Sequence, residues 1–381
     1  MLILLLILIL LPDCYRTWRY SRRKSKKPLW EQLLRWVPSL VMVALLFLQV
    51  DPATTATIVE IAMGLFFVPR FVIHLFSAVG RPLRRFSKRR ANWGRLLGLL
   101  MALLVVGVFA YGRFFEANRI VVKQMEMTFS NLPDAFDGYR IVTCSDLHIG
   151  SLPTDFVDRL VETVNLQHAD AIFLLGDVQN AHPQELYPYA SSLRKLHATD
   201  GVFSVLGNHD YSYYAPTVDE ALRIANERET VSRQQQAGWA VLDNSHLTIS
   251  RQGQQLYVAG TAFFADKRRH LRVTVPNKAD IDRALEGIPP SAFTILLQHN
   301  PTEWKSEIAG RHSVALTLSG HTHGGQLQLF GLRPSRLLWS EDSGLYSQGH
   351  QRLYVTTGLG GVFRFRFNVP PEVVVITLRK S

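Results

Sequence analysis

Five short stretches of the sequence place carboxylate, imidazole or amide side chains directly after apolar runs of strand length. They are Asp146-Leu147-His148, Gly176-Asp177, Gly207-Asn208-His209-Asp210, Gln298-His299-Asn300 and Gly320-His321-Thr322-His323. In α/β folds, the ends of neighbouring strands meet at one edge of a sheet, and sites form there. A single histidine of this kind would be an ordinary core or surface residue. Five polar strand ends in one chain predict that their side chains converge on a site.

The side-chain types in these stretches favour a divalent first-row metal ion over Ca²⁺ or a thiolate-bound metal. Seven of them are candidate ligands: Asp146, His148, Asp177, Asn208, His299, His321 and His323. A carboxylate has two oxygens, so Asp177 can bridge two ions, which leaves three or four ligands for each. Two ions about 3.5–4 Å apart are the arrangement for in-line attack on phosphorus. We expect two divalent ions, and oxygen and nitrogen ligands leave Mn, Fe, Zn and Mg as open choices.

His209 is left over beside the candidate ligand Asn208. An imidazole at the mouth of a metal site can protonate the departing oxygen as a general acid, and Asp210 can orient its ring. His209 and Asp210 are therefore the predicted catalytic side chains.

The elements that must position these residues read as a soluble α/β domain from residue 116 onward. The runs before the five stretches, residues 140–144, 171–175, 202–206, 292–297 and 314–318, have the length and composition of buried strands. Residues 155–166 and 218–235 have helical patterns, and further strand candidates include residues 239–242, 247–250, 255–261, 327–330, 353–355 and 373–378. This mixture predicts two packed sheets with helices outside.

The basic charge of the chain lies in its first 115 residues. The formal net charge of the whole chain is +11, yet residues 116–381 contain 25 Lys+Arg and 27 Asp+Glu, a net of −2. The excess falls in two clusters between apolar runs, which is the positive-inside pattern of a multipass membrane protein. The α/β domain has no basic excess, so we expect no nucleic-acid binding.

Four apolar runs, at residues 1–11, 37–50, 58–79 and 96–111, predict about four helices in a membrane region of residues 1–115. The turn at residues 51–57 has no Lys or Arg, whereas residues 12–36 contain eight and residues 80–95 contain seven. Both basic loops should stay in the cytoplasm, so the domain of residues 116–381 should lie outside it, anchored to the cell membrane. Glu60, Arg70 and His74 are unusual within an apolar run, and a transport role would rest on them alone.

Taken together, the five stretches resemble the signature of the calcineurin-like metallophosphoesterases over residues 140–325. The resemblance implies a four-layer αββα sandwich with a dinuclear centre at the strand ends. It implies one ion held by Asp146, His148, Asp177 and His323, and a second held by Asp177, Asn208, His299 and His321. His209 corresponds to the catalytic histidine of the family. The membrane anchor, together with the ending from Gly358 to Glu372, is similar to a bacterial membrane-associated subgroup.

The sequence departs from the family pattern after Gly176-Asp177. The family often has another acid two or three residues later, where this chain has Val178, Gln179 and Asn180. That position is not usually a direct ligand, so the departure bears on how the metal is tuned rather than on which residues hold it.

The leading hypothesis is a membrane-anchored, metal-dependent phosphoric ester hydrolase that cleaves phosphomono- or diesters by attack of a metal-bound hydroxide. A lipid-linked pyrophosphatase, similar to family members that cleave UDP-diacylglucosamine, is an alternative. The segment Phe363-Arg364-Phe365-Arg366-Phe367 would support it by lying against a bilayer, but such nucleotide-linked precursors are made inside the cell. A non-catalytic binding scaffold is the alternative of another class, and scaffolds of this kind typically lose ligands that this chain keeps.

Overall fold

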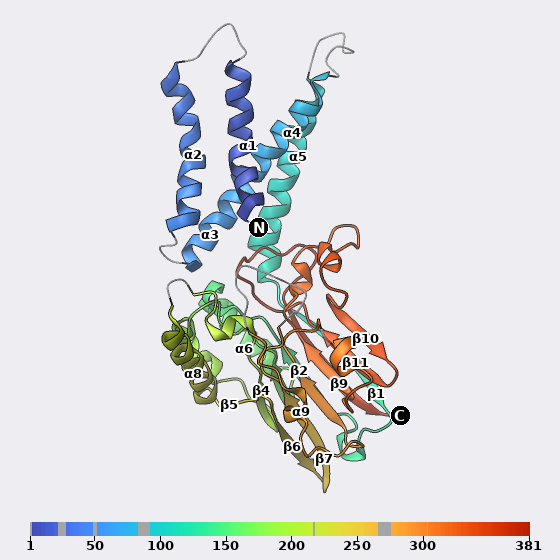
Figure 1. Ribbon diagram of the computed structural model, residues 1–381. Coiled ribbons are helices and arrows are strands. Elements are labelled where there is room, and N and C mark those ends of the chain that lie inside the picture. Colours follow the sequence, from blue (N-terminus) through green and yellow to red (C-terminus); the bar gives the residue numbers. More distant parts are fainter. Residues whose placement is uncertain are drawn as a thin grey trace. The chain divides into compact units, whose positions relative to one another are not determined.

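The computed structural model describes residues 2–21, 28–48, 52–82, 92–215, 218–265, 276–302 and 304–381. The chain divides into two compact units, Met1–Phe115 and Glu116–Ser381. We call the first the helical unit and the second the α/β unit, and each is described by itself (Figure 1).

The helical unit consists of long apolar helices. They are α1 (Leu2–Ser21), α2 (Leu29–Leu48), α3 (Pro52–Ala62), α4 (Val68–Val79) and α5 (Trp93–Ala110). A π-helical turn, Met63–Phe67, joins α3 to α4 without a break, and a second one, Tyr111–Phe115, extends α5. Among the described residues, Thr54–Val79 and Trp93–Asn118 are long and apolar enough to cross a membrane, while the apolar stretch Leu33–Phe47 is shorter.

Two predicted connections in this unit are wrong. Residues 51–57 were expected to form a turn, but α3 begins at Pro52, because proline is well suited to the first turn of a helix. The first basic loop was expected to begin at Pro12, but α1 continues through this residue to Ser21. Proline is tolerated inside apolar helices that pack against neighbouring helices. Arg16 and Arg19 are therefore helical residues, and the remainder of the first basic cluster, Arg22–Lys27, lies outside the described residues.

Several charged side chains inside the helical unit are paired. Arg70 of α4 forms an ion pair with the buried Asp13 of α1, and the hydroxyl of Ser39 of α2 donates to the same carboxylate. Glu60 lies 3.5 Å from the Nε atom of Arg113. Charged groups in an apolar medium need such partners, so these contacts link helices together and give Glu60 and Arg70 a structural role.

The first sheet of the α/β unit has six strands in the order β1-β12-β2-β3-β4-β5. The strands β2 to β5 run parallel to one another, and β12 is antiparallel to β2 and parallel to β1. Their bounds are β1 (Val121–Phe129), β2 (Arg140–Cys144), β3 (Ala171–Leu174), β4 (Gly201–Ser204), β5 (Trp239–Val241) and β12 (Glu372–Lys380).

The second sheet has the order β10-β11-β9-β8-β7-β6, with parallel strands at its centre and an antiparallel strand at each edge. Its strands are β6 (Ser245–Arg251), β7 (Gln254–Gly260), β8 (Thr294–Leu297), β9 (Leu316–Ser319), β10 (Gly344–Gln348) and β11 (Gln351–Val355).

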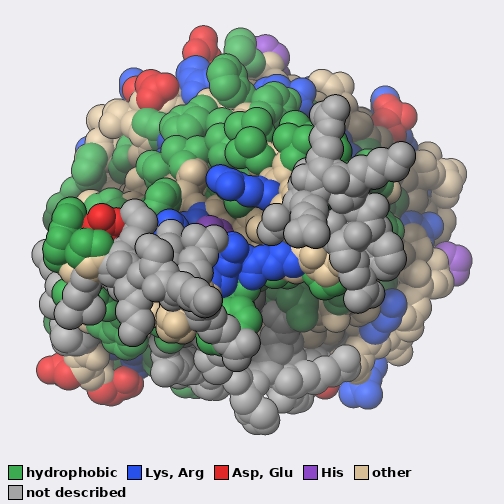
Figure 2. All heavy atoms as spheres, turned by 90° about the horizontal axis from the view of Figure 1, so that it is seen from above, with side chains coloured by type: hydrophobic (Ala, Val, Ile, Leu, Met, Phe, Trp, Pro, Cys, Tyr) green, Lys and Arg blue, Asp and Glu red, His purple; other side chains and the backbone are tan. Residues whose placement is uncertain are grey.

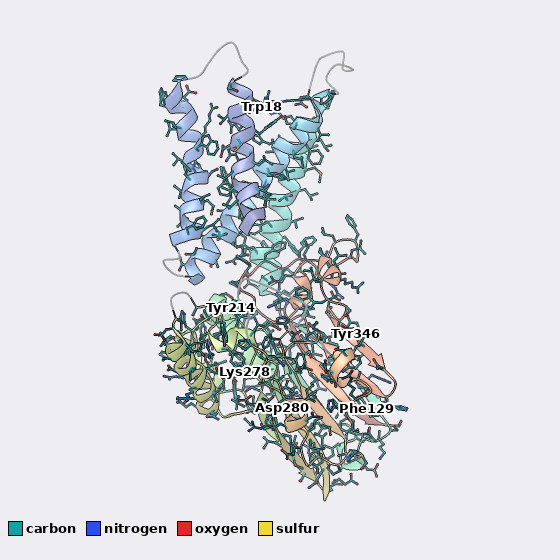
Figure 3. The ribbon with its side chains drawn as sticks, viewed as in Figure 1. Trp18, Phe129, Tyr214, Lys278, Asp280 and Tyr346 are labelled. Carbon is teal, nitrogen blue, oxygen red and sulfur yellow. The ribbon has the colours of Figure 1, made fainter. Side chains whose placement is uncertain are left out.

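A continuous apolar core lies between the two sheets. Ile141 and Phe173 of the first sheet meet Val258 and Ile295 of the second in this core. At its margin, Phe129 of β1 packs edge-on against Phe293, with ring centroids 5.0 Å apart (Figure 3). The central strands are buried on both faces, as expected for parallel strands covered on two sides.

Helices cover the outer faces of both sheets. The helix α6 (Thr154–Asn165) packs its apolar face, which includes Phe156 and Leu160, against the first sheet, and α8 (Glu220–Gln236) lies beside β5. The short helix α9 (Ile281–Ala284) and the turn Trp304–Ile308 cover the second sheet. The predicted fold class, apolar helices followed by an α/β domain with two packed sheets, is confirmed.

One strand prediction in this unit is wrong. Residues 327–330 make only isolated bridges, Leu327 with Phe367 and Leu329 with Leu332, rather than a strand. The apolar side chains that suggested a buried strand are in fact exposed, and Phe330 is fully exposed. The sequence also missed β1 and the edge strand β10, in which polar residues are frequent.

Candidate metal centre

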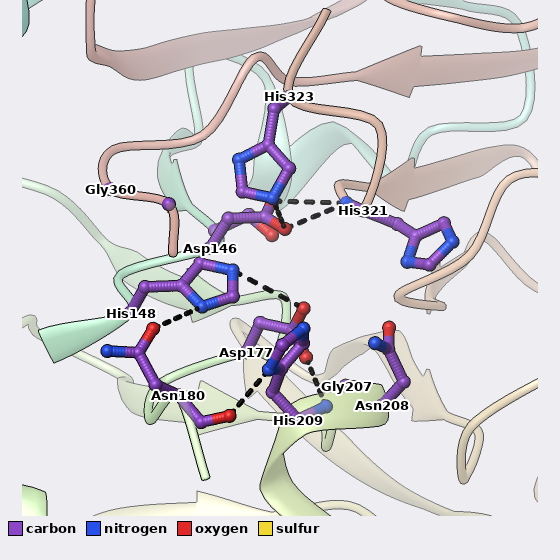
Figure 4. Close-up of polar contacts among 12 residues, drawn as sticks. Asp146, His148, Asp177, Asn180, Gly207, Asn208, His209, His321, His323 and Gly360 are labelled. Atoms are coloured by element: carbon purple, nitrogen blue, oxygen red, sulfur yellow. Dashed lines mark hydrogen bonds and ion pairs between the residues drawn. The ribbon is translucent and has the colours of Figure 1, made fainter. Parts of the chain in front are cut away.

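All seven candidate ligands meet where strands of both sheets end. Asp146 and His148 follow β2, Asp177 follows β3, and Asn208 follows β4. The other three come from the second sheet, His299 after β8 and His321 and His323 after β9. Figure 4 shows most of these side chains directed toward one another from separate loops. The convergence expected from the sequence is therefore present in the structure.

The geometry centres on one oxygen of Asp177. Its Oδ2 atom lies 3.2 Å from Nε2 of His299 and 3.6 Å from Nε2 of His148. Its Oδ1 atom instead accepts a hydrogen bond of 2.8 Å from the backbone N–H of His209. From the sequence, each oxygen of Asp177 could serve one ion. In the structure, the single atom Oδ2 faces both groups of candidate ligands.

The remaining ligands flank this oxygen on two sides. On one side, Nε2 of His323 lies 3.4 Å from Oδ1 of Asp146. On the other, Nδ1 of His321 lies 3.3 Å from Nε2 of His299. Two groups of side chains, Asp146 with His148 and His323, and Asp177 with His299 and His321, each bring their ligand atoms within 4.8 Å of one another. A third group, His148 with Asp177 and His209, joins them.

Buried nitrogen and oxygen atoms that lack a hydrogen-bond partner indicate whether these residues suit metal ions. His148 Nε2 and Asn208 Oδ1 are buried without a hydrogen-bond partner among the described residues. Their other atoms are fixed, because His148 Nδ1 bonds Asn180 Oδ1 at 2.9 Å and Asn208 Nδ2 donates to the Tyr214 hydroxyl at 3.1 Å. A buried polar atom without a partner is costly. Cations bound in the centre would satisfy these atoms, so the residues fit a metal site.

The electrostatics of the histidines point the same way. Burial lowers the pKa of His148, His321 and His323 to about 3, which keeps these imidazoles neutral, the form that binds metals. His299 behaves differently: burial opposes the shift, but the Asp177 carboxylate raises its pKa to about 9. Its Nδ1 atom bonds the Leu175 carbonyl at 2.6 Å, so Nε2 faces the carboxylate. That contact needs a positive charge, from a proton or from a metal ion.

The backbone of the ligands is strained in a common way. Asp146, His148, Asp177, His321 and His323 all have φ angles between 47° and 72°, the left-handed region. Residues other than glycine rarely adopt it, and such conformations cluster at functional sites because surrounding contacts must hold them. In this backbone conformation, the side chains of these five candidate ligands point from their loops toward the centre.

Two glycines allow the ligand loops to approach. A Cβ atom on Gly207 would lie 2.2 Å from Oδ1 of Asp177, so no larger residue fits against this carboxylate. Gly358 has φ +68°, and a Cβ atom there would lie 2.7 Å from that of Asp146. The glycines of these stretches thus allow the close approach of ligand loops.

Asp210 has a different role from the one predicted. Its carboxylate is fully buried and accepts hydrogen bonds from the backbone N–H groups of Asp177, Val178 and Gly207, at 2.8–3.0 Å. The Nδ1 atom of His209 bonds the carbonyl of Asn180 at 2.5 Å instead. The prediction that Asp210 orients the His209 ring is therefore wrong. Asp210 ties the loop that carries Asp177 to the loop that carries Asn208 and His209.

His209 lies at the margin of the centre and is half-buried. Its ring stacks on Tyr214, with centroids 4.2 Å apart, and meets the ring of His148 edge-on at 4.7 Å. Sequence reasoning missed Tyr214, which lies in a loop with no motif of its own. It also missed Asn180, which contacts both His148 and His209, although the departure from the family pattern at this position was a signal.

Arg366, within the segment Phe363–Phe367, is buried, whereas its neighbours in the segment are partly exposed. Arg366 is 1% exposed, and its guanidinium donates to the carbonyls of Thr357, Gly360 and Val369. Burial lowers its pKa to about 10, which leaves it charged at neutral pH. Arg366 therefore holds the loop that packs against Asp146, and the expectation that this residue of the segment lies against a bilayer is wrong.

Comparison with known families matches both parts of the chain. A family described as "Calcineurin-like phosphoesterase" matches residues 139–325, and one described as "Probable Calcineurin-like phosphoesterase, transmembrane domain" matches residues 1–117. The uncharacterized metallophosphoesterase YkuE of Bacillus subtilis is 30% identical over 314 residues, covering 78% of this chain and all of the relative. The chain belongs to the calcineurin-like metallophosphoesterases. The predicted class of enzyme, a metal-dependent phosphoric ester hydrolase, is confirmed.

A second relative and a solved structure are also similar to this chain. A transmembrane protein with metallophosphoesterase domain from Danio rerio is 27% identical, covering 78% of this chain and 67% of that protein. Among solved structures, a dimetal phosphatase from Danio rerio covers 63% of this chain and 99% of its own, with 11% identity and a TM-score of 0.33. The match to a transmembrane domain and the two long apolar helices indicate a membrane metallophosphoesterase.

Proposed function

We propose that this metallophosphoesterase hydrolyses phosphomono- or diesters with two divalent ions, and that its α/β unit lies outside the cytoplasm. The position of Asp177 Oδ2, within 3.6 Å of the Nε2 atoms of both His148 and His299, carries the proposal of two ions. A carboxylate oxygen between two imidazoles, with a further carboxylate and two further imidazoles beyond them, suits a shared ligand rather than a single ion pair.

Two ligand sets follow from this arrangement. Asp146, His148, Asp177 and His323 would hold one ion, and Asp177, Asn208, His299 and His321 would hold the other. When bound, the two ions would supply Lewis acidity to the phosphoryl oxygen and lower the pKa of the attacking water. The unpartnered atoms of His148 and Asn208 support this division, since one falls in each set.

His209 would protonate the leaving oxygen. Its Nδ1–H donates to the Asn180 carbonyl, so the transferable proton of the imidazolium form is on Nε2. Stacking on Tyr214 fixes the plane of the ring. The histidine is half-buried beside the ligands, so it can reach a substrate bound to them. Asp210 would act only through the loops that it joins.

The non-catalytic scaffold is the alternative of another class. It predicts a centre in which ligands are missing or turned away. All seven ligand side chains are instead retained, and their buried atoms face one another, which supports an enzyme. The lipid-linked pyrophosphatase loses part of its support, because Arg366 is an internal residue.

The experiment is a hydrolysis assay on the full-length protein in detergent, stripped of metal and reloaded with Mn²⁺, Zn²⁺, Fe²⁺ or Mg²⁺. We expect release of nitrophenol from nitrophenyl phosphate or bis(nitrophenyl) phosphate with at least one metal. Asp146→Asn should abolish this activity, and the matched change Asp155→Asn on the exposed face of α6 should not. Equal activity of wild type and Asp146→Asn would contradict the proposal, as would a protein inactive on every ester and metal.

A further inference from the structure

The helical unit contains a basic cavity, remote from the metal ligands in sequence, at one end of its bundle. The cavity has a volume of about 420 Å³ and lies where α1 and α4 finish and α5 begins. It is lined by Tyr15, Arg16 and Arg19 of α1, Ile73, His74 and Ser77 of α4, and Arg95 of α5. In Figure 2, Lys and Arg side chains gather with a histidine in a hollow between hydrophobic side chains.

No carboxylate of the described residues pairs with the three arginines that line this cavity. Among the residues that the structure describes, Arg16, Arg19 and Arg95 form no ion pair with a carboxylate, unlike Arg35, which pairs with Glu31. Several cations gathered in a small volume repel one another and raise the local positive potential. The cavity therefore attracts an anion.

One buried polar atom that lines the cavity, and another on an arginine beside Tyr15, have no hydrogen-bond partner among the described residues. The hydroxyl of Tyr15, which lines it, is buried with no hydrogen-bond partner in the described part of the chain. Arg81 lies over the Tyr15 ring, 5.1 Å from the centroid, and its Nη2 atom is likewise buried without a hydrogen-bond partner there. Guanidinium and hydroxyl donors gathered around a cavity are the groups that bind phosphate oxygens.

An apolar groove adjoins the basic cavity. It has a volume of about 160 Å³ and is lined by Leu11, Pro12, Tyr15, Phe71, His74, Leu75 and Ala78. Tyr15 and His74 line both spaces, so the groove between α1 and α4 continues from the cavity. A site with a cationic cavity at one end and an apolar groove beside it fits an amphiphile with a phosphate head and a hydrocarbon chain.

We propose that this site binds an anionic phospholipid of the membrane, with the phosphate among Arg16, Arg19 and Arg95 and an acyl chain in the groove. Basic pockets between membrane helices bind such headgroups at the cytoplasmic face, where the sequence places the two basic segments. The lipid would neutralise the arginines and join α1, α4 and α5.

Native mass spectrometry of the full-length protein in a neutral detergent tests the proposal. The probe is dioleoyl phosphatidylglycerol, and dioleoylglycerol, which has the chains without the phosphate, is the comparison. We expect one phosphatidylglycerol to be retained per chain in preference to dioleoylglycerol. R16Q combined with R95Q should weaken retention about fivefold for each arginine removed, whereas R35Q on α2 should leave it unchanged. Equal retention of both lipids, or no effect of R16Q with R95Q, would overturn the proposal.

A second pair of measurements separates a lipid from a soluble phosphate. Ala78→Trp should fill the groove and weaken retention of phosphatidylglycerol. Glycerol 3-phosphate, which has the phosphate without the chains, should compete only at far higher concentration. If it competes as well as the lipid does, and Ala78→Trp has no effect, the cavity takes a soluble anion and the lipid assignment is wrong. Should the double variant not fold, R95Q alone, at an exposed position, replaces it.

Discussion

At the scale of single residues, Asp177 makes the sharpest prediction. We expect Asp177→Asn to cost more activity than any other ligand change, because Oδ2 would serve both ions and the lost charge weakens both sets of ligands. Metal content measured by plasma mass spectrometry should fall by more than one ion per chain. Asp155→Asn, on an exposed helix face, is the matched control. Two ions at full occupancy in Asp177→Asn would rule out the shared ligand.

His209→Ala should reduce kcat by about 10²–10⁴-fold and leave metal content nearly unchanged, since the ring would act on the leaving group. The loss should be smaller for esters with acidic leaving groups, such as nitrophenols, because these need less protonation. Rates measured across a series of leaving-group pKa values check this, with His197→Ala on the surface as the control. An equal loss across the series would remove His209 from the role of general acid.

Asn180 offers a test of the support around the ligands. Its side chain accepts from His148 and its carbonyl accepts from His209. Asn180→Ala should weaken metal binding by about 10–100-fold, because His148 loses the partner that fixes its ring. Asn180→Asp restores an acceptor and should recover affinity in a metal titration. If both variants bind metal as the wild type does, the contact with His148 is incidental.

Much of the centre was predictable at the residue scale, and the limits have physical reasons. Side-chain types and their places after apolar runs follow from the sequence, so the convergence of all seven candidate ligands could be predicted. The hydrogen bonds of Asp210 could not be predicted, because a carboxylate next to a histidine in the sequence can accept either from the imidazole ring or from backbone N–H groups. The stacking of Tyr214 on His209 depends on the conformation of a loop, and hydrophobic periodicity in the sequence does not predict loop conformation.

At the scale of elements, the five strands that lead into the site were predicted, and the errors lie at sheet edges and helix starts. A central strand is buried on both faces, so its composition is distinctive. The edge strand β10 contains both polar and apolar residues, so its composition is not typical of a strand. The apolar residues near Phe330 are exposed, although their sequence resembles that of a buried strand. The positive φ angles of the candidate ligands could not be predicted either, since contacts with neighbouring loops impose them.

Gly207→Ala tests how closely the strand-end loops must approach. The added Cβ atom would meet Oδ1 of Asp177 at 2.2 Å, so the loops must separate. We expect a loss of about 1–3 kcal/mol in the free energy of unfolding, together with reduced metal content. Thermal unfolding and metal analysis measure the two effects. Gly107→Ala, in a helix with open space around it, should change neither. An unaltered metal content in Gly207→Ala would mean that the loops adapt freely.

At the scale of the whole molecule, the distribution of charge predicts which side of the membrane carries the chemistry. Residues 12–36 and 80–95 contain eight and seven Lys+Arg, and residues 51–57 contain none. Cationic segments resist translocation, so α5 should begin in the cytoplasm and lead outward to residue 116. The net charge of −2 on residues 116–381 gives no opposing signal. The direction of α5 does not depend on whether the shorter apolar stretch Leu33–Phe47 spans the membrane, since the second basic segment directly precedes α5.

Reporter fusions test this orientation. Alkaline phosphatase fused after Ser381 should be active and green fluorescent protein fused there should be dark, because each folds on only one side of the membrane. The same reporters fused after residue 90, within the second basic segment, are the matched control and should give the reverse pair. A fluorescent fusion after Ser381, with inactive phosphatase, would place the metal centre in the cytoplasm. That outcome would favour the alternative function, the lipid-linked pyrophosphatase, because its nucleotide-linked substrates are made on that side.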